Sequence, residues 1–201
     1  SVTENMDFVF AGFDYFLNNG DTELTTHHAI MVPSSCFNTT EQMNSSNVVT
    51  NGYTGSAMYK TNLAKYRTGI INAFGSAHVL SHRRLLTNAN NDSYYSMGGA
   101  NWKGATTGWG WVDAKVELMT EPMVYGCHPM SSSRYDIGDG QMQLPLFKLA
   151  PNYKIARLGK TGARQWWWLS AVASATYFCV ARSHGGASHS GASDAGGVRP
   201  Y

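Results

Sequence analysis

One amphipathic helix is the strongest structural signal in these 201 residues. Over Gly55–Phe74, aromatic and aliphatic side chains recur at spacings of four, three, four and four, which places them on one helical face. These side chains are Tyr59, Leu63, Tyr66, Ile70 and Phe74. Thr54 or Ser56 can cap the start, and Gly75 stands where a left-handed terminator belongs. An apolar stripe of this kind must pack against something larger than the helix itself.

Short strand-like runs surround the predicted helix. Met6–Leu17 is apolar and aromatic and ends at a turn over residues 18–21, whereas residues 88–110 are rich in Asn, Gly and Ser and predict a long ordered loop. The expected strands are Ala29–Val32, Trp111–Met119, Met123–Tyr125, Leu144–Leu149, and Trp166–Leu169 leading into Val172–Val180. Strands, one or two helices and long connections predict an α+β fold with antiparallel strands.

The composition is that of one globular domain with a polar but weakly charged surface. Charged residues make up 14% of the chain, against about a quarter in typical domains, and Gly, Ser and Asn fill the difference. A net charge of +2 gives no polybasic field, so nucleic acid is not an expected partner. We also expect no membrane-spanning helix and no signal peptide. A single domain is expected over residues 1–201.

The last 33 residues, 169–201, contain no Lys, Met, Trp, Gln or Glu, although these types supply 31 of the 201 residues. An even distribution leaves such a gap with a probability of roughly half a per cent. None of the five types has a codon that ends in a pyrimidine, whereas every type that fills the segment has one. Randomising Asn codons at their adenines while keeping the final pyrimidine produces this bias. The plainer explanation is a small-residue turn region or a low-complexity tail.

Bulky apolar residues frame this biased segment. Trp166–Leu169 precede it, Tyr177-Phe178 lie within it, and a compact Gly-Val-Arg-Pro string over 197–200 closes it. Disordered tails rarely lie between such anchors. A fixed frame with variable filling is how a rigid scaffold presents binding residues.

The string WWWLSAVASATYFCVARSHGGASHSGASDAGGVRP resembles the C-terminal module of gut-bacterial and phage proteins that share a WWLR…GVRP pattern. Upstream strings such as GDTELTTHHAIMVP, INAFGSAHVLSHRRLLTNA and VELMTEPMVYG fit the same phage family. These proteins are similar to the variable proteins of diversity-generating retroelements, which include phage tropism determinants. The resemblance implies a C-type lectin-like fold that displays adenine-mutagenised residues. It also implies ligand or receptor binding at a phage tail or related virion surface, with no enzymatic activity and no cofactor.

The resemblance assigns roles to positions of this chain, with residues 1–169 as scaffold and about 170–196 as the variable segment. The framework positions would be Trp167, Trp168, Leu169, Val172, Phe178, Val180, Ala187, Ala192, Gly197, Val198, Arg199 and Pro200. The variable, ligand-binding positions would be Ser170, Ala171, Thr176, Tyr177, Ala181, Arg182, Ser183, His184, Gly186, Ser188, His189, Ser190, Asp194 and Ala195. Ser170 stands where the family commonly has Arg, and these two residues interconvert within an adenine-randomised codon set.

Five of the variable positions carry side chains able to make strong contacts. Tyr177 and Arg182 are the first expected contacts because aromatic and Arg side chains dominate binding hot spots. His184, His189 and Asp194 complete the group. The partner would be an unidentified protein or glycan of the host surface, and several copies on one particle would strengthen a modest single-site affinity.

Other motifs support weaker hypotheses. His78 and His82 have a helical spacing that could hold a metal, but the metalloprotease Glu is absent and hydrogen-bonded structural histidines are more usual. The His27-His28 pair is most simply a loop-to-strand junction. Asp136 and Asp139 lie in a YDIGDG string that resembles a cation loop, yet it lacks the further acidic ligands, which favours a plain turn.

Two alternatives to ligand recognition remain from the sequence. Formylglycine-generating oxidases also have a lectin-like fold and bind copper through two cysteines, which here would need Cys127 and Cys179 within a few ångströms of each other. Cys179 in its YFCV run is expected to be a buried thiol. A structural tail or capsid-decoration protein would instead bury residues 181–195 in a subunit interface. A binding surface predicts that the same residues are exposed on an ordered backbone.

Overall fold

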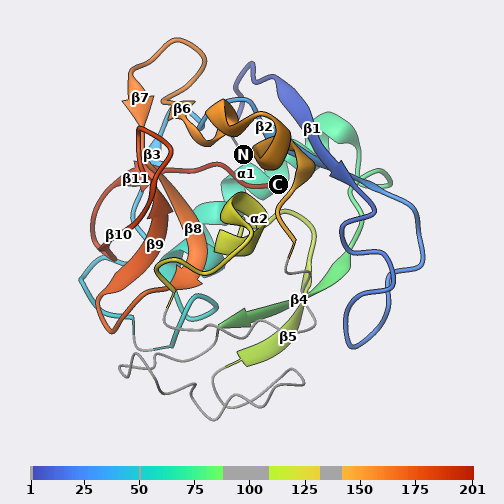
Figure 1. Ribbon diagram of the computed structural model, residues 1–201, viewed down its shortest axis with the longest axis horizontal. Helices are drawn as coiled ribbons and strands as arrows, with labels where there is room; N and C mark the ends of the chain where they lie inside the picture. Colours follow the sequence, from blue (N-terminus) through green and yellow to red (C-terminus); the bar gives the residue numbers. More distant parts are fainter. Residues whose placement is uncertain (1, 50, 88–108, 132–141) are drawn as a thin grey trace.

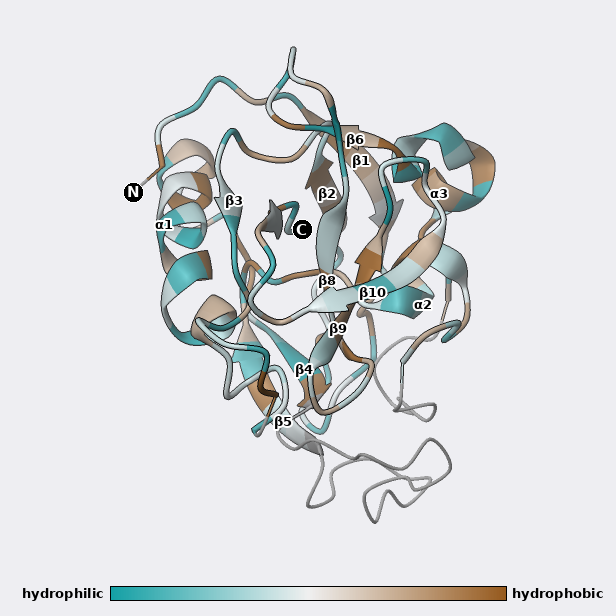
Figure 2. Ribbon diagram, turned by 90° about the vertical axis from the view of Figure 1, so that its left-hand side faces the viewer, coloured by the Kyte–Doolittle hydropathy of each residue, from teal (hydrophilic) through white to brown (hydrophobic). Residues whose placement is uncertain are grey.

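A computed structural model describes residues 2–49, 51–87, 109–131 and 142–201. A five-stranded sheet lies at its centre, with α1 on one side and the short helices α2 and α3 on the other (Figure 2). Small two-stranded sheets lie around this core (Figure 1). The predicted α+β class is confirmed. None of the described helices combines the length and apolarity needed to cross a membrane.

The central sheet is built mainly from the C-terminal part of the chain. Its strand order is β10-β9-β8-β11-β3, and all neighbours are antiparallel except the parallel pair β8 and β11. The five strands are β3 (Thr40–Glu41), β8 (Trp167–Val172), β9 (Tyr177–Ala181), β10 (Ala187–Gly191) and β11 (Gly196–Gly197). The antiparallel pairs around them are β1 (Phe8–Phe13) with β2 (Ala29–Pro33), β4 (His82–Thr87) with β5 (Trp109–Ala114), and β6 (Ala156–Arg157) with β7 (Arg164–Gln165).

The helix expected over residues 55–74 is present but begins three residues later. A π-helical turn, η1 (Met58–Asn62), leads directly into α1 (Leu63–Phe74). Gly75 has a φ of 86° and donates its N–H to the carbonyl of Ile71, so the predicted terminator is confirmed. The predicted stripe is buried through Leu63, Tyr66 and Ile70.

Two segments expected to be strands are short helices. α2 (Glu121–Tyr125) replaces the strand expected at 123–125, because Thr120 Oγ1 accepts the N–H of Met123 at 3.4 Å and a proline occupies the first turn. α3 (Pro145–Leu149) replaces the strand expected at 144–149, again with proline in the first turn, and the 3₁₀ turn η2 (Pro151–Lys154) follows it. Short apolar runs fit either period, and a proline in the first turn favours the helix in both segments.

Two further expected strands are shorter than predicted. β5 ends at Ala114, and beyond it Glu117 exchanges backbone hydrogen bonds with Tyr201 at 3.0 and 3.3 Å. The segment expected as a strand over 172–180 is broken at residues 173–176, where the chain turns from β8 into β9. The expected loop over 88–110 lies largely outside the described residues.

The tryptophan triplet sends neighbouring side chains into two different cores. Trp167 packs with Phe147 of α3, whereas Trp168 belongs to the second buried cluster, which includes Tyr66 of α1, and neither tryptophan has exposed surface. Neighbouring side chains of β8 therefore lie on opposite faces of the sheet, as in any β-strand. Because both faces of the sheet are covered, burial fixes the register of β8 from both sides.

Candidate ligand-binding site

The predicted variable positions lie on β8, on the β9–β10 hairpin and on the turns that flank it. In the hairpin, Tyr177 faces Gly191 and Ala181 faces Ala187 across the antiparallel register. β10 is an edge strand of the central sheet (Figure 1). β9 is buried on both faces except at Tyr177, so the accessible parts of the hairpin are Tyr177, the turn and the edge strand β10.

Burial separates the predicted framework from most of the predicted variable positions. Every framework position is buried except Ala187, which is half-buried. The exposed variable positions are Tyr177, His184, His189, Asp194 and Ala195, and the half-buried ones are Thr176, Arg182, Ser183, Gly186, Ser188 and Ser190.

Three expected contact residues are inside the protein. Ser170, Ala171 and Ala181 have exposed fractions of 3%, 7% and 0%, so the expectation of a surface continuous over residues 170–195 is wrong at these positions. Ser170 donates its N–H to the carbonyl of Met119 at 3.0 Å, which fixes it against the start of α2. These three side chains belong to the support of the site rather than to its contact surface.

An aromatic pair forms one end of the exposed surface. The rings of Tyr177 and His189 lie 4.7 Å apart between centroids at an angle of 48°. Tyr177 lies opposite Gly191, which has no side chain, and His189 is two residues away along β10. The pair presents two exposed rings, inclined to each other, with polar atoms at their edges, and each ring can contact an aromatic ring or a peptide plane of a partner.

Hydrogen bonds within the turn between β9 and β10, and one from Tyr125 of α2, hold this turn in place. The Arg182 N–H donates to the Gly186 carbonyl and the Gly185 N–H returns a bond to the Arg182 carbonyl, both at 2.8 Å. Gly185 has a φ of 87°, and its carbonyl accepts from the Tyr125 hydroxyl at 3.1 Å. His184, at the tip of this turn, stays exposed on a fixed backbone.

Asp194 organises the opposite turn. Its Oδ2 accepts the Ser190 hydroxyl and the Gly191 N–H, each at 2.8 Å. The next residue back, Ser193, donates its N–H and its hydroxyl to Oδ1 of Asn47 at 3.0 and 2.8 Å. Asp194 was expected to be a strong ligand contact, but this carboxylate already serves two internal donors.

A titratable group lies behind the hairpin. The Cys179 thiol is buried and hydrogen-bonded to the carboxyl of Glu121 in α2. Burial raises the pKa of Glu121 to about 7, although this thiol and the N–H groups of Met130 and Ser131 act in the opposite direction. The support of the hairpin thus contains a carboxyl group that titrates near neutral pH.

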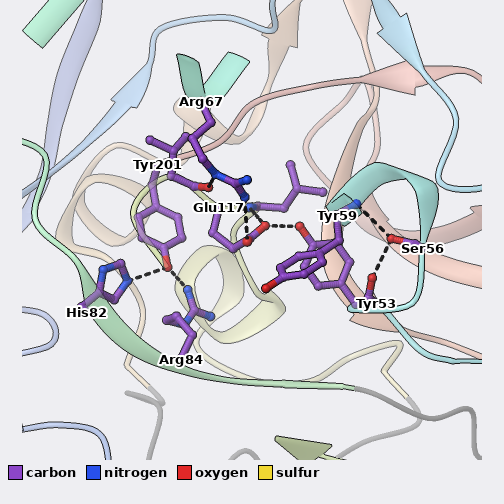
Figure 3. Close-up of polar contacts among 10 residues, drawn as sticks. Tyr53, Ser56, Tyr59, Arg67, His82, Arg84, Glu117 and Tyr201 are labelled. Carbon is purple, nitrogen blue, oxygen red and sulfur yellow. Dashed lines mark hydrogen bonds and ion pairs between the residues drawn. The ribbon is translucent and has the colours of Figure 1, made fainter. Parts of the chain in front are cut away.

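A buried polar cluster anchors the C-terminal end of the chain (Figure 3). The Tyr53 hydroxyl donates to the Glu117 carboxylate, and Arg67 lies 3.6 Å from the other carboxylate oxygen. The Tyr201 hydroxyl accepts from Arg84 and lies 3.1 Å from His82 Nε2. Sequence reasoning missed this cluster because nothing in the string marks Glu117 or Arg84 as buried.

The other predicted sites are not assembled. His78 and His82 do not share a helix, since α1 ends at Phe74 and His82 begins β4. His27 is exposed and its Nδ1 lies 2.8 Å from Asp14 Oδ2. No cluster of three or more His, Cys, Asp or Glu side chains arranged for a metal ion occurs within the described residues.

The remaining candidates concern the cysteines and the acidic loop. Cys127 is exposed and Cys179 is buried, and both are free thiols. The predicted cation loop with Asp136 and Asp139 lies outside the described residues.

No known protein family, curated protein or solved structure matches this chain. The resemblance stated from the sequence therefore rests on its motifs alone.

Proposed function

We propose that this chain is a ligand-binding variable protein. In this proposal an α+β scaffold of C-type lectin-like fold displays adenine-mutagenised residues to a host-surface protein or glycan. The chain is a component of a phage tail or related virion surface and catalyses no reaction. One observation carries the proposal. Between residues 167 and 200, the positions assigned to the framework are buried, with Ala187 half-buried, whereas most positions assigned as variable are not buried.

Two pairs of residues show how closely the assignment follows burial. Phe178, assigned to the framework, has no exposed surface, whereas the adjacent Tyr177, assigned as variable, is 41% exposed. Arg199, assigned to the framework, is fully buried, whereas Arg182, assigned as variable, is half-buried. Since hydrophobicity alone does not separate two arginines, the assignment carries information beyond a simple hydrophobic pattern.

The chemistry of the displayed set favours a small contact area. Tyr177, Arg182, His184 and His189 supply two rings, a guanidinium and a further imidazole, while the other displayed positions are mostly Ala, Ser, Gly or Thr. Such a set supports modest affinity for one copy. Presentation of several copies on one particle raises the effective affinity by orders of magnitude, roughly a hundredfold or more.

The decisive experiment is on the gene. We expect a near-copy of its last hundred or so bases nearby, with a reverse transcriptase gene beside it. The differences between the two copies should fall opposite adenines in the codons of the exposed variable positions. If the flanks hold no such copy, or if the differences are spread over framework codons such as those of Phe178 and Arg199, the proposal is wrong.

The second candidate is a structural tail or capsid-decoration protein. It is favoured by the position of β10 at the edge of the sheet, since edge strands readily pair with another chain. A Ser188→Cys variant in a Cys127→Ser background tests it by maleimide labelling on the assembled particle. Ready labelling supports the recognition role, whereas protection on the particle together with labelling of the free chain supports the structural role.

A further inference from the structure

A cavity of about 460 Å³ lies on a part of the molecule that the proposed function does not use. It opens between the C-terminal end of α1, strand β2 and the segment 77–82 that leads into β4. Its volume is within the range of sites for small molecules, about 300–1,000 Å³. None of the residues that line it is a predicted variable position.

Aromatic rings form much of the cavity wall. Phe16 stacks on His82 at 4.3 Å between centroids, with 28° between the planes, and lies nearly parallel to His28 at 6.2 Å. Phe8 and Phe74 also line the cavity and make an edge-to-face contact at 5.1 Å. Phe16 and His82 are only 1% and 8% exposed, so the rings open to a bound molecule are those of the half-buried Phe8 and the exposed Phe74. A flat ring system can pack against these rings, whereas a branched aliphatic ligand gains no such contact.

The two wall histidines already have polar partners. His28 accepts the N–H of Phe16 at 3.1 Å through Nε2, and its Nδ1 lies 2.9 Å from the Thr26 carbonyl. His82 is bonded to Tyr201, and burial followed by the nearby Arg84 charge lowers the pKa of His82 to about 3. His82 is therefore neutral at physiological pH and adds no charge to the cavity.

The lining of the cavity carries one lysine. Lys115 is exposed, and the exposed His78 adds ring nitrogens that can donate, whereas His27 Nδ1 lies 2.8 Å from Asp14 Oδ2 outside the lining. Among the described lining residues there is no Asp or Glu. An acidic group on a bound molecule would thus meet a cation and would face no carboxylate in the lining.

We propose that this cavity binds a flat aromatic anion, with its ring system packed against Phe8 and Phe74 and its acidic group directed toward Lys115. The volume, the accessible aromatic rings and the lysine each select one property of the ligand: its size, its flatness and its charge. The proposal is independent of ligand recognition by the β9–β10 hairpin.

The test uses two fluorescent probes that share an aromatic framework. Anilinonaphthalene sulfonate carries an anionic group, and phenylnaphthylamine is its uncharged counterpart. We expect the sulfonate to bind the whole chain with one-to-one stoichiometry and to bind more tightly than the neutral probe. Lys115→Gln should weaken the sulfonate about two- to fivefold and leave the neutral probe unchanged, as expected for one exposed ion pair.

Matched tryptophan variants locate the binding. Ala77→Trp places an indole in the cavity lining and should weaken both probes at least about tenfold, because stacking area is lost. Asn72→Trp adds the same side chain at an exposed position of α1 outside the lining and should change neither affinity. Unfolding curves of both variants confirm that each is folded.

Exposed phenylalanines offer a competing place for such dyes. Phe10 and Phe13 are 61% and 70% exposed and stack at 5.7 Å on β1. A Phe10→Ser, Phe13→Ser double variant should keep both affinities. Loss of binding in this variant, or full binding in Ala77→Trp, overturns the cavity assignment, and equal effects of Lys115→Gln on the two probes overturn the assignment of an anion.

Discussion

Two arginines of the C-terminal segment show how the same side chain can have a structural role at one position and be partly accessible at another. Arg199 is completely buried: its Nε donates to the Pro33 carbonyl at 2.9 Å, and its guanidinium lies 5.2 Å from the centroid of the Trp167 ring. Burial lowers the pKa of Arg199 to about 10. Arg182 is half-buried at the β9–β10 turn, and its guanidinium donates one hydrogen bond to the His189 carbonyl at 3.3 Å.

The difference extends from the two side chains to the regions around them. Around Arg199, aromatic rings and the carbonyls of Pro33 and Tyr153 hold the guanidinium in place, so this region supports the structure. Around Arg182, backbone hydrogen bonds fix the chain while the side chains of His184 and His189 are exposed. A region of this second kind tolerates substitution without loss of the fold.

Truncation of Trp168, a buried framework residue, should cause the largest loss of stability. Its side chain has no exposed surface, and its indole N–H donates to the Glu41 carbonyl at 2.7 Å. Trp168→Ala should lower the free energy of unfolding by about 4 kcal/mol, measured by urea denaturation. Trp166→Ala is the control, since Trp166 is half-buried, and an equal loss in both variants would contradict the assigned difference.

The buried alanine within the variable segment should reject a large side chain. Ala181→Arg places a charge at a position with no exposed surface and should cost about 3 kcal/mol of unfolding free energy. Ala195→Arg makes the same change at an exposed position and should shift stability by less than about 0.5 kcal/mol. Similar stability of the two variants would show that Ala181 can turn outward and belongs to the displayed surface.

Acid should destabilise the protein through His82. Its pKa in the folded state is about 3, below the ordinary 6.5, so below pH 6.5 protons bind preferentially to the unfolded chain. Stability from this group is complete above pH 6.5 and is lost as the pH falls toward 3. Between pH 7 and 4 the wild-type protein should lose about 2 to 3 kcal/mol more than His82→Phe does. Parallel pH profiles of the two proteins would refute this assignment.

The exposed pair should matter least to stability. Tyr177→Ala removes the ring contact with His189 and should cost at most about 1 kcal/mol. Phe178→Ala, one residue along the same strand, should cost about 3 to 5 kcal/mol because Phe178 is fully buried. Thermal unfolding of the two variants under identical conditions decides between a displayed and a structural Tyr177.

Several local features were predictable because short-range physics controls them. The stripe of α1 and its end at Gly75 follow from helical periodicity and from the positive φ that glycine tolerates. The opposite directions of Trp167 and Trp168 follow from the alternation of a strand. The short apolar runs at 123–125 and 144–149 were mispredicted, because runs of three and six residues fit both periods and a proline in the first turn favoured the helix.

By itself the amino-acid sequence determined the class of the fold, the main helix and the division of the last 33 residues into bulky anchors and small filling. Tertiary structure alone decided that Ser170, Ala171 and Ala181 are enclosed, that Asp194 is occupied within its own turn, and that Phe16, His82 and Lys115 border one cavity. The reason is physical. Periodicity and capping act between residues a few positions apart, whereas burial and cavities depend on which distant segments cover both faces of the sheet.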